Sequence, residues 1–328
     1  TMIHFLFGLD AFCVFSSPYA VRTLKPDCYR AKDMGFPLKG YVYCYPGQAN
    51  YLGGDILSGI AETEIYKQEE LSVFLDIGTN GELVIGNKDF LVAGAGAAGP
   101  ALEGGVVKTG MRAEPGAVDR VHIENGQVNI HVIGETEAKG ICGSGIVDLL
   151  AEMFLNGWID VRGRYVEEAS EKIREVDGEL AAEYAPGLFF FQKDIEEFLK
   201  TKAAAGTMVE YMMGEVGLEM KDIGRFYVAG AFGTHISKEA GVTVGLYPDI
   251  PRDKIILPGN SSLSGARKML LNRKLKEEIE EVLDKMTYIQ FGAVDNFLHI
   301  MVAAEAIPHT DIRRYPSVEK ELKKRGLL

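Results

Sequence analysis

An acidic residue directly after an apolar run is the first position in this sequence that suggests chemistry. Asp76 follows the apolar run of residues 73–75. The turn after it contains Gly78, Thr79, Asn80 and Gly81. A glycine-rich turn points backbone N–H groups into a concavity that suits phosphate oxygens, and a nearby carboxylate can bind the Mg²⁺ that accompanies a nucleotide. We therefore nominate Asp76 as a metal ligand and catalytic group, and the turn residues as cofactor-binding. The alternative is an ordinary β-hairpin, which Asn80-Gly81 also indicates.

A second glycine-rich loop occurs near residue 230. Residues 225–229 form another apolar run, and the turn after it contains Gly230, Ala231 and Gly233. In an open α/β sheet, ligands bind outside the carboxyl ends of the strands, where such loops gather. Two loops of this form, one of them carrying a carboxylate, predict two sides of one ligand cleft.

Residues 94–105 form the most glycine-dense segment of the chain. Pro100 suits the first turn of a short helix, and the N–H groups ahead of it would be free to bind an anion. Gly99 is therefore a candidate for cofactor binding, and Glu103 is a candidate catalytic carboxylate. The alternative is a flexible loop with a stub of helix.

Two helix starts and one lysine complete the candidates for cofactor binding. Ser144 suits the N-cap of a helix after Gly143, and Asn260 opens another helix from a lead-in rich in serine and glycine. Lys202 lies on the apolar stripe of a long helix expected over residues 194–216. There it either snorkels from the edge of the core or faces a nucleotide.

The elements that must position these residues follow from apolar periodicity and turn signals. Besides the hairpin of residues 73–86 and the run 225–229, we expect strands over 41–45, 89–93, 117–124, 127–132, 254–257 and 287–291. We expect helices over 1–12, 48–66, 144–157, 194–216, 236–245, 273–285 and 294–304, one that starts within 258–265 and runs to 271, and a surface helix in the tail 308–328. Residues 162–187 are strongly charged, which predicts an exposed excursion.

Composition narrows the function classes. The formal net charge of −12 argues against a broad surface for nucleic acid or anionic membrane. No apolar run reaches the 18 or so residues that a membrane-spanning helix needs, and no signal peptide is recognisable. The four cysteines include no C-x-x-C pair, and the histidines show no metal-ligand spacing, so we expect a reduced, cytoplasmic protein. A catalytic thiol at Cys142 is not favoured, because no base lies beside it in sequence.

Six motifs in a fixed order resemble those of a known family. They are Leu-Asp-Ile-Gly-Thr-Asn-Gly-Glu at 75–82, Ala-Ala-Gly-Pro-Ala-Leu-Glu-Gly at 97–104, Gly-Met-Arg-Ala at 110–113, Gly-Ile-Cys-Gly-Ser-Gly at 140–145, Ala-Gly-Ala-Phe-Gly at 229–233 and Gly-Asn-Ser-Ser-Leu-Ser-Gly-Ala at 259–266. Together they resemble the C-terminal domain of reductive activators of corrinoid proteins, over about residues 1–310. The resemblance implies the superfamily of sugar kinases, chaperones and actin. It also implies an α/β fold of ribonuclease-H type, with two lobes of mixed sheets flanked by helices and ATP between them.

The resemblance further implies an ATP-dependent electron transfer. An N-terminal [2Fe–2S] cluster would reduce the Co(II) corrinoid of a partner protein to Co(I), which restores methyl transfer. Residues 76–82 would be the second phosphate loop and 230–233 the adenosine loop, with ATP and Mg²⁺ as cofactors. The helix around residues 50–60 would be the hinge between lobes. A corrinoid protein is the implied partner, and a homodimer is the expected assembly.

Three departures from the family pattern bear on these expectations. Neither the family's earlier Asp-Ile-Gly-Thr-type loop nor its iron–sulfur cysteines occur in this sequence, and the resemblance places both upstream of Thr1. Gly-Ala-Gly at 94–96 also stands where a more polar run is expected. We therefore divide the chain into the remainder of a first lobe (1–70), a second lobe (71–310) and a surface tail (311–328), and expect the fragment alone to be inactive. The alternative functions are a small-molecule kinase of the same superfamily, with Glu103 as the nearest candidate base, and a non-catalytic dimerisation or docking module.

Overall fold

A computed structural model describes residues 2–15, 23–26, 28–49, 51–78, 80–96, 105, 107–230, 235–291 and 297–328. The strands are β1 (Cys28–Arg30), β2 (Tyr41–Tyr43), β3 (Ser72–Ile77), β4 (Gly81–Gly86), β5 (Leu91–Gly96), β6 (Ala117–Glu124), β7 (Gln127–Val132), β8 (Gly140–Ile141), β9 (Ile173–Val176), β10 (Glu179–Ala185), β11 (Leu188–Phe191), β12 (Arg225–Ala229), β13 (Ile255–Gly259) and β14 (Met286–Gln290). The α-helices are α1 (Met2–Leu6), α2 (Phe12–Phe15), α3 (Gly54–Thr63), α4 (Gly143–Leu155), α5 (Gln192–Glu215), α6 (Lys238–Thr243), α7 (Ser261–Leu271), α8 (Lys274–Lys285), α9 (Phe297–Ala304) and α10 (Pro316–Lys324).

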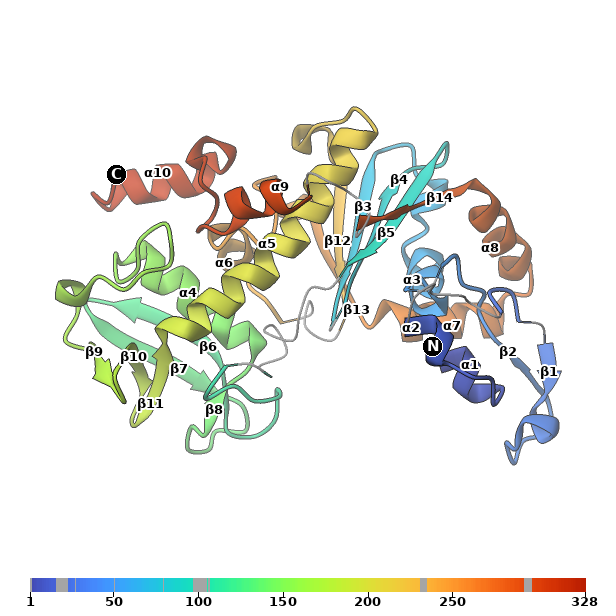
Figure 1. The fold of residues 1–328 in the computed structure, drawn as a ribbon, viewed down its shortest axis with the longest axis horizontal. Coiled ribbons are helices and arrows are strands. Elements are labelled where there is room, and N and C mark those ends of the chain that lie inside the picture. The colour runs from blue at the N-terminus through green and yellow to red at the C-terminus, as the bar shows by residue number, and fades with distance from the viewer. Residues whose placement is uncertain are drawn as a thin grey trace.

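A six-stranded mixed sheet, in the order β13-β12-β3-β4-β5-β14, forms the centre of one part of the molecule (Figure 1). The strands β3, β4 and β5 are an antiparallel meander, as predicted, while β12 and β13 run parallel to β3. The predicted strand over 287–291 is β14, which pairs in parallel with β5. The carboxyl ends of β3, β12 and β13 therefore lie at the same edge of the sheet.

Alternation along the strands divides the apolar side chains between two cores. Val73, Leu75 and Ile77 on β3 belong to the core that includes α4 and α5. Phe74, with Val84 across from it on β4, belongs to the core that includes α3 and α8. Both faces of the sheet are covered, so β3 reads as a nearly continuous apolar run until Asp76.

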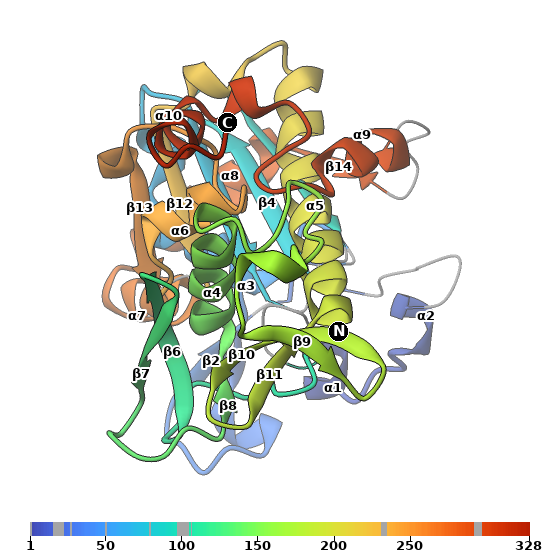
Figure 2. The ribbon, with the colours of Figure 1, turned by 90° about the vertical axis from the view of Figure 1, so that its left-hand side faces the viewer.

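The other part of the molecule holds two three-stranded sheets, ordered β7-β6-β8 and β11-β10-β9. The helix α5 runs obliquely from this part toward the six-stranded sheet (Figure 1), and α4 packs against β6. Figure 2 shows β6 and β7 at one margin and β9 to β11 beside α5. The predicted Asn125-Gly126 turn joins β6 and β7, and both residues have positive φ, 51° and 74°, as a type I′ hairpin turn requires.

The prediction that residues 162–187 form an exposed excursion is wrong. This segment contains the whole of β9 and β10, and Ile173, Ala181, Ala182 and Tyr184 are buried. The charged residues Arg174 and Glu175 of β9 are exposed, so part of the charge in this segment faces solvent on a sheet that also contains these buried residues.

The residues at which helices begin differ from the predicted ones more than the strand positions do. The helix expected over 48–66 begins only at Gly54, because Gly53 is extended, with φ −104° and ψ −163°. Ser144 is not an N-cap: Cys142 holds that position, and Ser144 lies inside the first turn of α4. The expected helix over 1–12 is divided into α1 and α2, and the one over 236–245 is shortened to α6.

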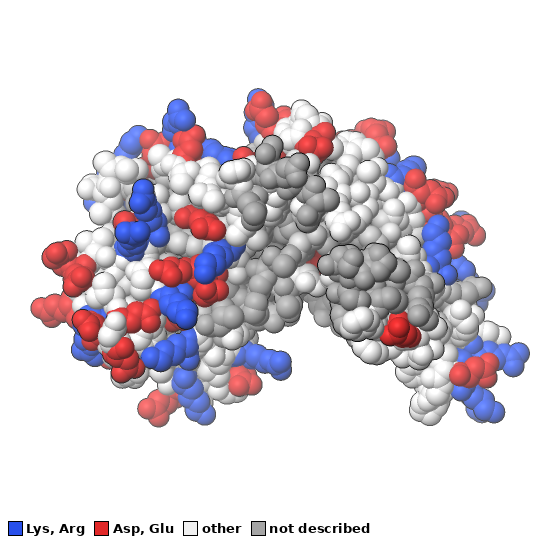
Figure 3. Space-filling model, in the orientation of Figure 1, with Lys and Arg blue, Asp and Glu red and all other residues white. Residues whose placement is uncertain are grey.

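The charged surface and the helices add two observations on the class of protein. Lys and Arg are interspersed with Asp and Glu on the face drawn in Figure 3, without a broad basic area. Among the described residues, none of the helices has both the length and the apolar character that a membrane crossing needs.

Candidate functional site

Asp76 lies at the sheet edge where three parallel strands end. It pairs in register with Ala229 of β12, which in turn pairs with Gly259 of β13. Gly230 directly follows Ala229 and Asn260 directly follows Gly259, so the topology brings both to the edge that carries Asp76. The two predicted glycine loops therefore start side by side, at the edge where open α/β sheets bind ligands.

Gly230 approaches the Asp76 carboxylate very closely. A Cβ atom at Gly230 would lie 2.8 Å from the Asp76 Oδ1 atom and 2.8 Å from the Ile77 carbonyl oxygen. The φ of Gly230 is +96°, which strains any residue with a side chain. Glycine at this position therefore lets the backbone of one loop contact the carboxylate of the other.

Two further carboxylates lie on the Asp76 side of the sheet. Neither is among the nominated site residues, although Glu82 ends the predicted phosphate loop 76–82. Glu82 on β4 is directly opposite Asp76 in the β3–β4 register, and Asp55 lies in the first turn of α3, which packs on this face. The predicted Asn80-Gly81 turn did not signal Glu82, because a two-residue turn there would place Asp76 opposite Ile85, whereas the structure pairs Ile77 with Gly81 and therefore Asp76 with Glu82. Asp55 lies beside Gly53 and Gly54, a spacing that indicates close approach of a backbone or ligand, but its position near Asp76 depends on how α3 packs.

Burial and mutual repulsion disfavour the ionised forms of these carboxyls. Burial, together with the Asp55 charge, raises the pKa of Asp76 to about 6. Burial and the charges of Asp55 and Asp76 raise the pKa of Glu82 to about 8. Carboxylates that repel each other in a partly desolvated place are stabilised by a bound cation.

The carboxyl pair fits a Mg²⁺ ion that a nucleotide helps to hold. In the described part of the chain, no three His, Cys, Asp or Glu side chains converge as a complete metal site. Mg²⁺ is usually bound by one or two carboxylates, with water and phosphate oxygens as its other ligands. Asp76 and Glu82 can supply the protein's share of such a set.

The turn after Asp76 is more tightly bonded than predicted. The Gly78 N–H donates to the Asn80 carbonyl oxygen at 2.9 Å, so in this structure it is not free for phosphate. The Asn80 side chain is hydrogen-bonded to Glu82 and lowers the pKa of that carboxyl, against the larger effect of burial. Gly81 pairs with Ile77 and Gly96 inside the sheet. Asn80 thus contacts one of the two carboxyls, Glu82.

Three other nominated residues have structural roles. Asn260 caps α7, its Oδ1 atom accepting from the Leu263 N–H at 2.9 Å. Gly143 and Ser144 are buried at the start of α4. The glycine after them packs there too, because a Cβ at Gly145 would lie 2.3 Å from the Val118 carbonyl oxygen.

The prediction that Lys202 faces a nucleotide is wrong in this structure. Its side chain is only 1% exposed, and its Nζ atom donates to the carbonyl oxygens of Ala304, Ala306 and Pro308 at 2.7, 2.5 and 2.5 Å. An ammonium group has three protons, so all of them are used. Lys202 fixes the segment that follows α9 onto α5.

The remaining nominated residues lie outside the described part of the chain. They are Thr79, Gly99, Glu103, Ala231 and Gly233.

A comparison with protein families identifies the chain. A family model described as the C-terminal domain of RACo, the ASKHA domain, matches residues 70–319. The chain belongs to the RACo family. A second family model, described as the RACo middle region, matches residues 1–68. The ASKHA class comprises actin, sugar kinases and Hsp70, which confirms both the resemblance and the predicted fold class.

Relatives of this RACo-family chain carry related names. A solved structure titled as a reductive activator for corrinoid, iron–sulfur protein superimposes with a TM-score of 0.88 and 38% identity, covering 97% of this chain and 52% of that one. The corrinoid activation enzyme RamQ of Eubacterium limosum is 32% identical over 76% of this chain and 45% of its own length. A reductase of a Co(II) methylated-amine-specific corrinoid protein from Methanosarcina barkeri is 29% identical over 74% of this chain and 46% of its own. The chain thus spans about half the length of these relatives.

Proposed function

We propose that this chain is the nucleotide- and partner-binding portion of an ATP-dependent reductive activase, which returns a corrinoid protein from Co(II) to Co(I) for methyl transfer. The names of the RACo-family relatives support the corrinoid protein as the partner. Nucleotide binding is supported mainly by the position of Asp76, which lies at the carboxyl end of β3 beside the parallel strand β12 and opposite Glu82 of β4. Gly230 lies directly beside the Asp76 carboxylate. The electron donor, predicted to be a [2Fe–2S] cluster, stays a prediction, as does the homodimer.

The residues at this edge would bind and orient a magnesium nucleotide. Bound Mg²⁺ neutralises phosphate charge and fixes the phosphate oxygens. Asp76 and Glu82 would bind it directly or through water and lose their protons in doing so, because a cation reverses the repulsion that raises their pKa values. Gly230 leaves room for the phosphates beside Asp76. Binding energy would then be used to change the arrangement of the two parts of the molecule, which is a gating role.

The melting temperature of the chain with and without Mg-ATP tests the nucleotide part of this proposal. A ligand at 100 times its dissociation constant stabilises a protein by about 2.7 kcal/mol, which raises the melting temperature of a domain of this size class by several degrees. We expect such a shift for the native chain and none for Asp76→Ala.

Asp148→Asn is the matched control. Asp148 lies on α4, and burial also raises its pKa to about 6, but the charges that act on it are those of Glu152, Arg120 and Asp119. We expect this variant to keep the shift produced by Mg-ATP. An equal shift in Asp76→Ala would show that Asp76 does not contribute to the site. The absence of a shift at millimolar ATP in the native chain would mean that the family's earlier phosphate loop is required for binding, or that the chain is a docking module.

A further inference from the structure

The solvent-facing side of α7 carries an apolar stripe. The exposed residues of this helix are Leu263, Ala266, Arg267, Leu270 and Leu271, at positions i, i+3, i+4, i+7 and i+8. Leu263, Leu270 and Leu271 are 67%, 84% and 78% exposed. This spacing is the one by which amphipathic helices bury an apolar face, yet here the face points to water. We name these five residues the α7 stripe.

The packing of α7 prevents the stripe from turning inward. On the opposite side of the helix, Gly265 lies so close to α3 that a Cβ atom there would be 1.8 Å from the Ser58 carbonyl oxygen. The Ser58 hydroxyl also donates to the Ser262 carbonyl oxygen at 2.5 Å. These contacts fix how α7 is rotated against α3.

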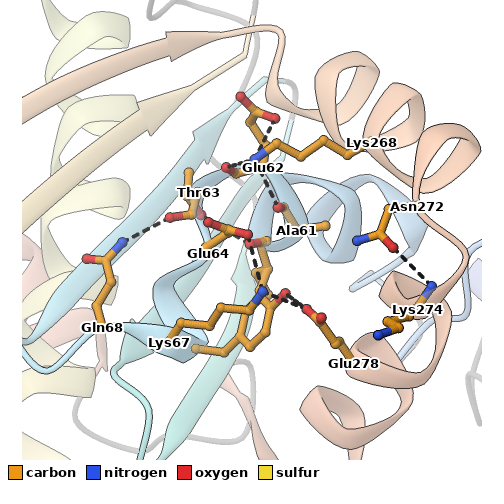
Figure 4. A network of polar contacts seen from close by, with 12 residues as sticks. Ala61, Glu62, Thr63, Glu64, Lys67, Gln68, Lys268, Asn272, Lys274 and Glu278 are labelled. Carbon is orange, nitrogen blue, oxygen red and sulfur yellow. Dashed lines mark hydrogen bonds and ion pairs between the residues drawn. The ribbon is translucent and has the colours of Figure 1, made fainter.

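Lys268 holds the same rotation from the other end of α3. Its Nζ atom donates to the Glu62 carbonyl oxygen at 2.8 Å and forms an ion pair with the Glu62 carboxylate at 3.3 Å (Figure 4). Its neighbour Arg267 is exposed. The exposed leucines are thus a fixed surface of the folded chain.

The charge on and near the stripe is positive. Arg267 lies in its middle, and Arg273 is exposed just beyond its carboxyl end. Neither forms an ion pair with another described residue. Both arginines are positively charged, in a chain whose net charge is −12. A carboxylate on a docked surface could pair with either guanidinium group.

The position of Arg267 argues against a second copy of this chain as the occupant. An isologous contact between two antiparallel α7 helices would place its two-fold axis at the middle of the stripe. Residue 267 is the midpoint between Leu263 and Leu271, so the two Arg267 side chains would meet. Like charges across an interface oppose association.

We propose that the α7 stripe docks an acidic amphipathic helix of a partner protein. Leucine-type residues of that helix would pack between Leu263, Leu270 and Leu271, and its carboxylates would pair with Arg267 and Arg273. This is the helix-to-helix mode of recognition, with anchors at helical spacing. Asn260 caps α7 at the sheet edge that carries Asp76, so one rigid helix joins the docking surface to the candidate nucleotide site. The inference does not depend on the corrinoid chemistry.

The probe is a pair of fluorescently labelled synthetic helical peptides measured by anisotropy. Both carry leucines at i, i+3, i+4 and i+7, flanked by glutamates in one peptide and by lysines in the other. We expect the chain to bind the glutamate peptide at least tenfold more tightly, and Leu270→Glu to weaken that binding at least tenfold. Arg267→Glu should reverse the preference between the two peptides. Leu38→Glu is the matched control, because Leu38 is 64% exposed on a different surface and should leave binding unchanged.

Two results would overturn the proposal. The first is equal binding of both peptides, or a preference that Arg267→Glu does not change. The second is a dimer in sedimentation velocity that Leu270→Glu converts to a monomer, since a second copy would then occupy the stripe. The melting temperature of each variant establishes that it is folded. The Mg-ATP shift, measured on Leu270→Glu, should persist, so that failure of the docking proposal is distinguishable from failure of the nucleotide proposal.

Discussion

At the scale of single residues, the acidic group around Asp76 decides how the site behaves. Asp55, Asp76 and Glu82 come from a helix and two strands, and they repel one another on one face of the sheet. Without a cation, this repulsion lowers the free energy of unfolding, and it therefore favours the binding of a cation. A ligand site that is destabilising when empty is a common compromise between folding and function.

Glu82→Gln should reduce the pH dependence of stability. The pKa of Glu82 is raised from 4.5 to about 8 in the folded state, so between these values the folded chain binds more protons than the unfolded chain. Its stability therefore falls as pH rises through this window, with a limiting slope of about 1.4 kcal/mol per pH unit from this group. We expect urea unfolding without nucleotide, from pH 5 to 8, to show a shallower decline for Glu82→Gln than for the native chain.

The control for this experiment is Glu124→Gln on the exposed side of β6. Its decline should match that of the native chain. Parallel curves for the native chain and Glu82→Gln would mean that Glu82 is ionised in the folded state, which would contradict its raised pKa.

At the scale of elements, glycines set how closely α3 can pack. Gly59 faces the Phe74 ring of β3, and a Cβ atom there would lie 2.4 Å from the ring. Gly265 brings α7 onto α3 in the same way. Apolar periodicity predicted the hinge helix but not the elements it packs against, because these are a strand and a helix distant in sequence.

Two glycine-to-alanine changes in helices should have opposite effects. Gly265→Ala would place a methyl group against the Ser58 backbone, and overpacking of this kind costs about 1–3 kcal/mol. Gly206→Ala in α5 meets nothing within 4 Å and should stabilise the chain by up to about 1 kcal/mol, through helix propensity. Denaturant midpoints at constant slope measure both. A neutral Gly265→Ala would show that α7 can shift away from α3, which would also weaken the case for a fixed stripe.

At the scale of the whole molecule, the described chain has two parts whose helices and sheets interlock. The α5 helix contributes to the core below the six-stranded sheet, and its Lys202 holds the segment after α9. The predicted tail helix is α10, and it buries Val318 and Leu322 against the same core. Ser317 at its start donates to the Asp249 carboxylate at 2.7 Å.

Removing residues 316–328 should therefore destabilise the chain substantially. Loss of two buried side chains at about 1.5–3 kcal/mol each predicts a decrease of about 3–6 kcal/mol in the free energy of unfolding. Lys324→Ala, which alters an exposed side chain of α10, should stay within about 0.5 kcal/mol of the native chain. Urea unfolding measures both variants. A truncated chain as stable as the native one would show that α10 is only a surface appendage.

Local runs of residues were enough to predict the hairpins, the glycine loops and the family. Asn-Gly turns and strand alternation act between neighbouring residues, so the β3–β4 and β6–β7 hairpins could be predicted without knowledge of the rest of the fold. The ordered motifs identified the family for a related reason, since each is itself a local run. Asp76 and Gly230 could each be nominated from its own local run, but their contact with each other could not.

Which side chains share a surface depended instead on the packing of the folded chain. The structure places Glu82 and Asp55 near Asp76, although neither was nominated from the sequence. It places Lys202 against backbone carbonyl groups and makes Cys142, not Ser144, the N-cap of α4. The outward turn of the α7 leucines also depends on contacts with α3, about 200 residues earlier in the chain. Such outcomes follow from packing and desolvation between distant segments, and these energies are not encoded in any local run of residues.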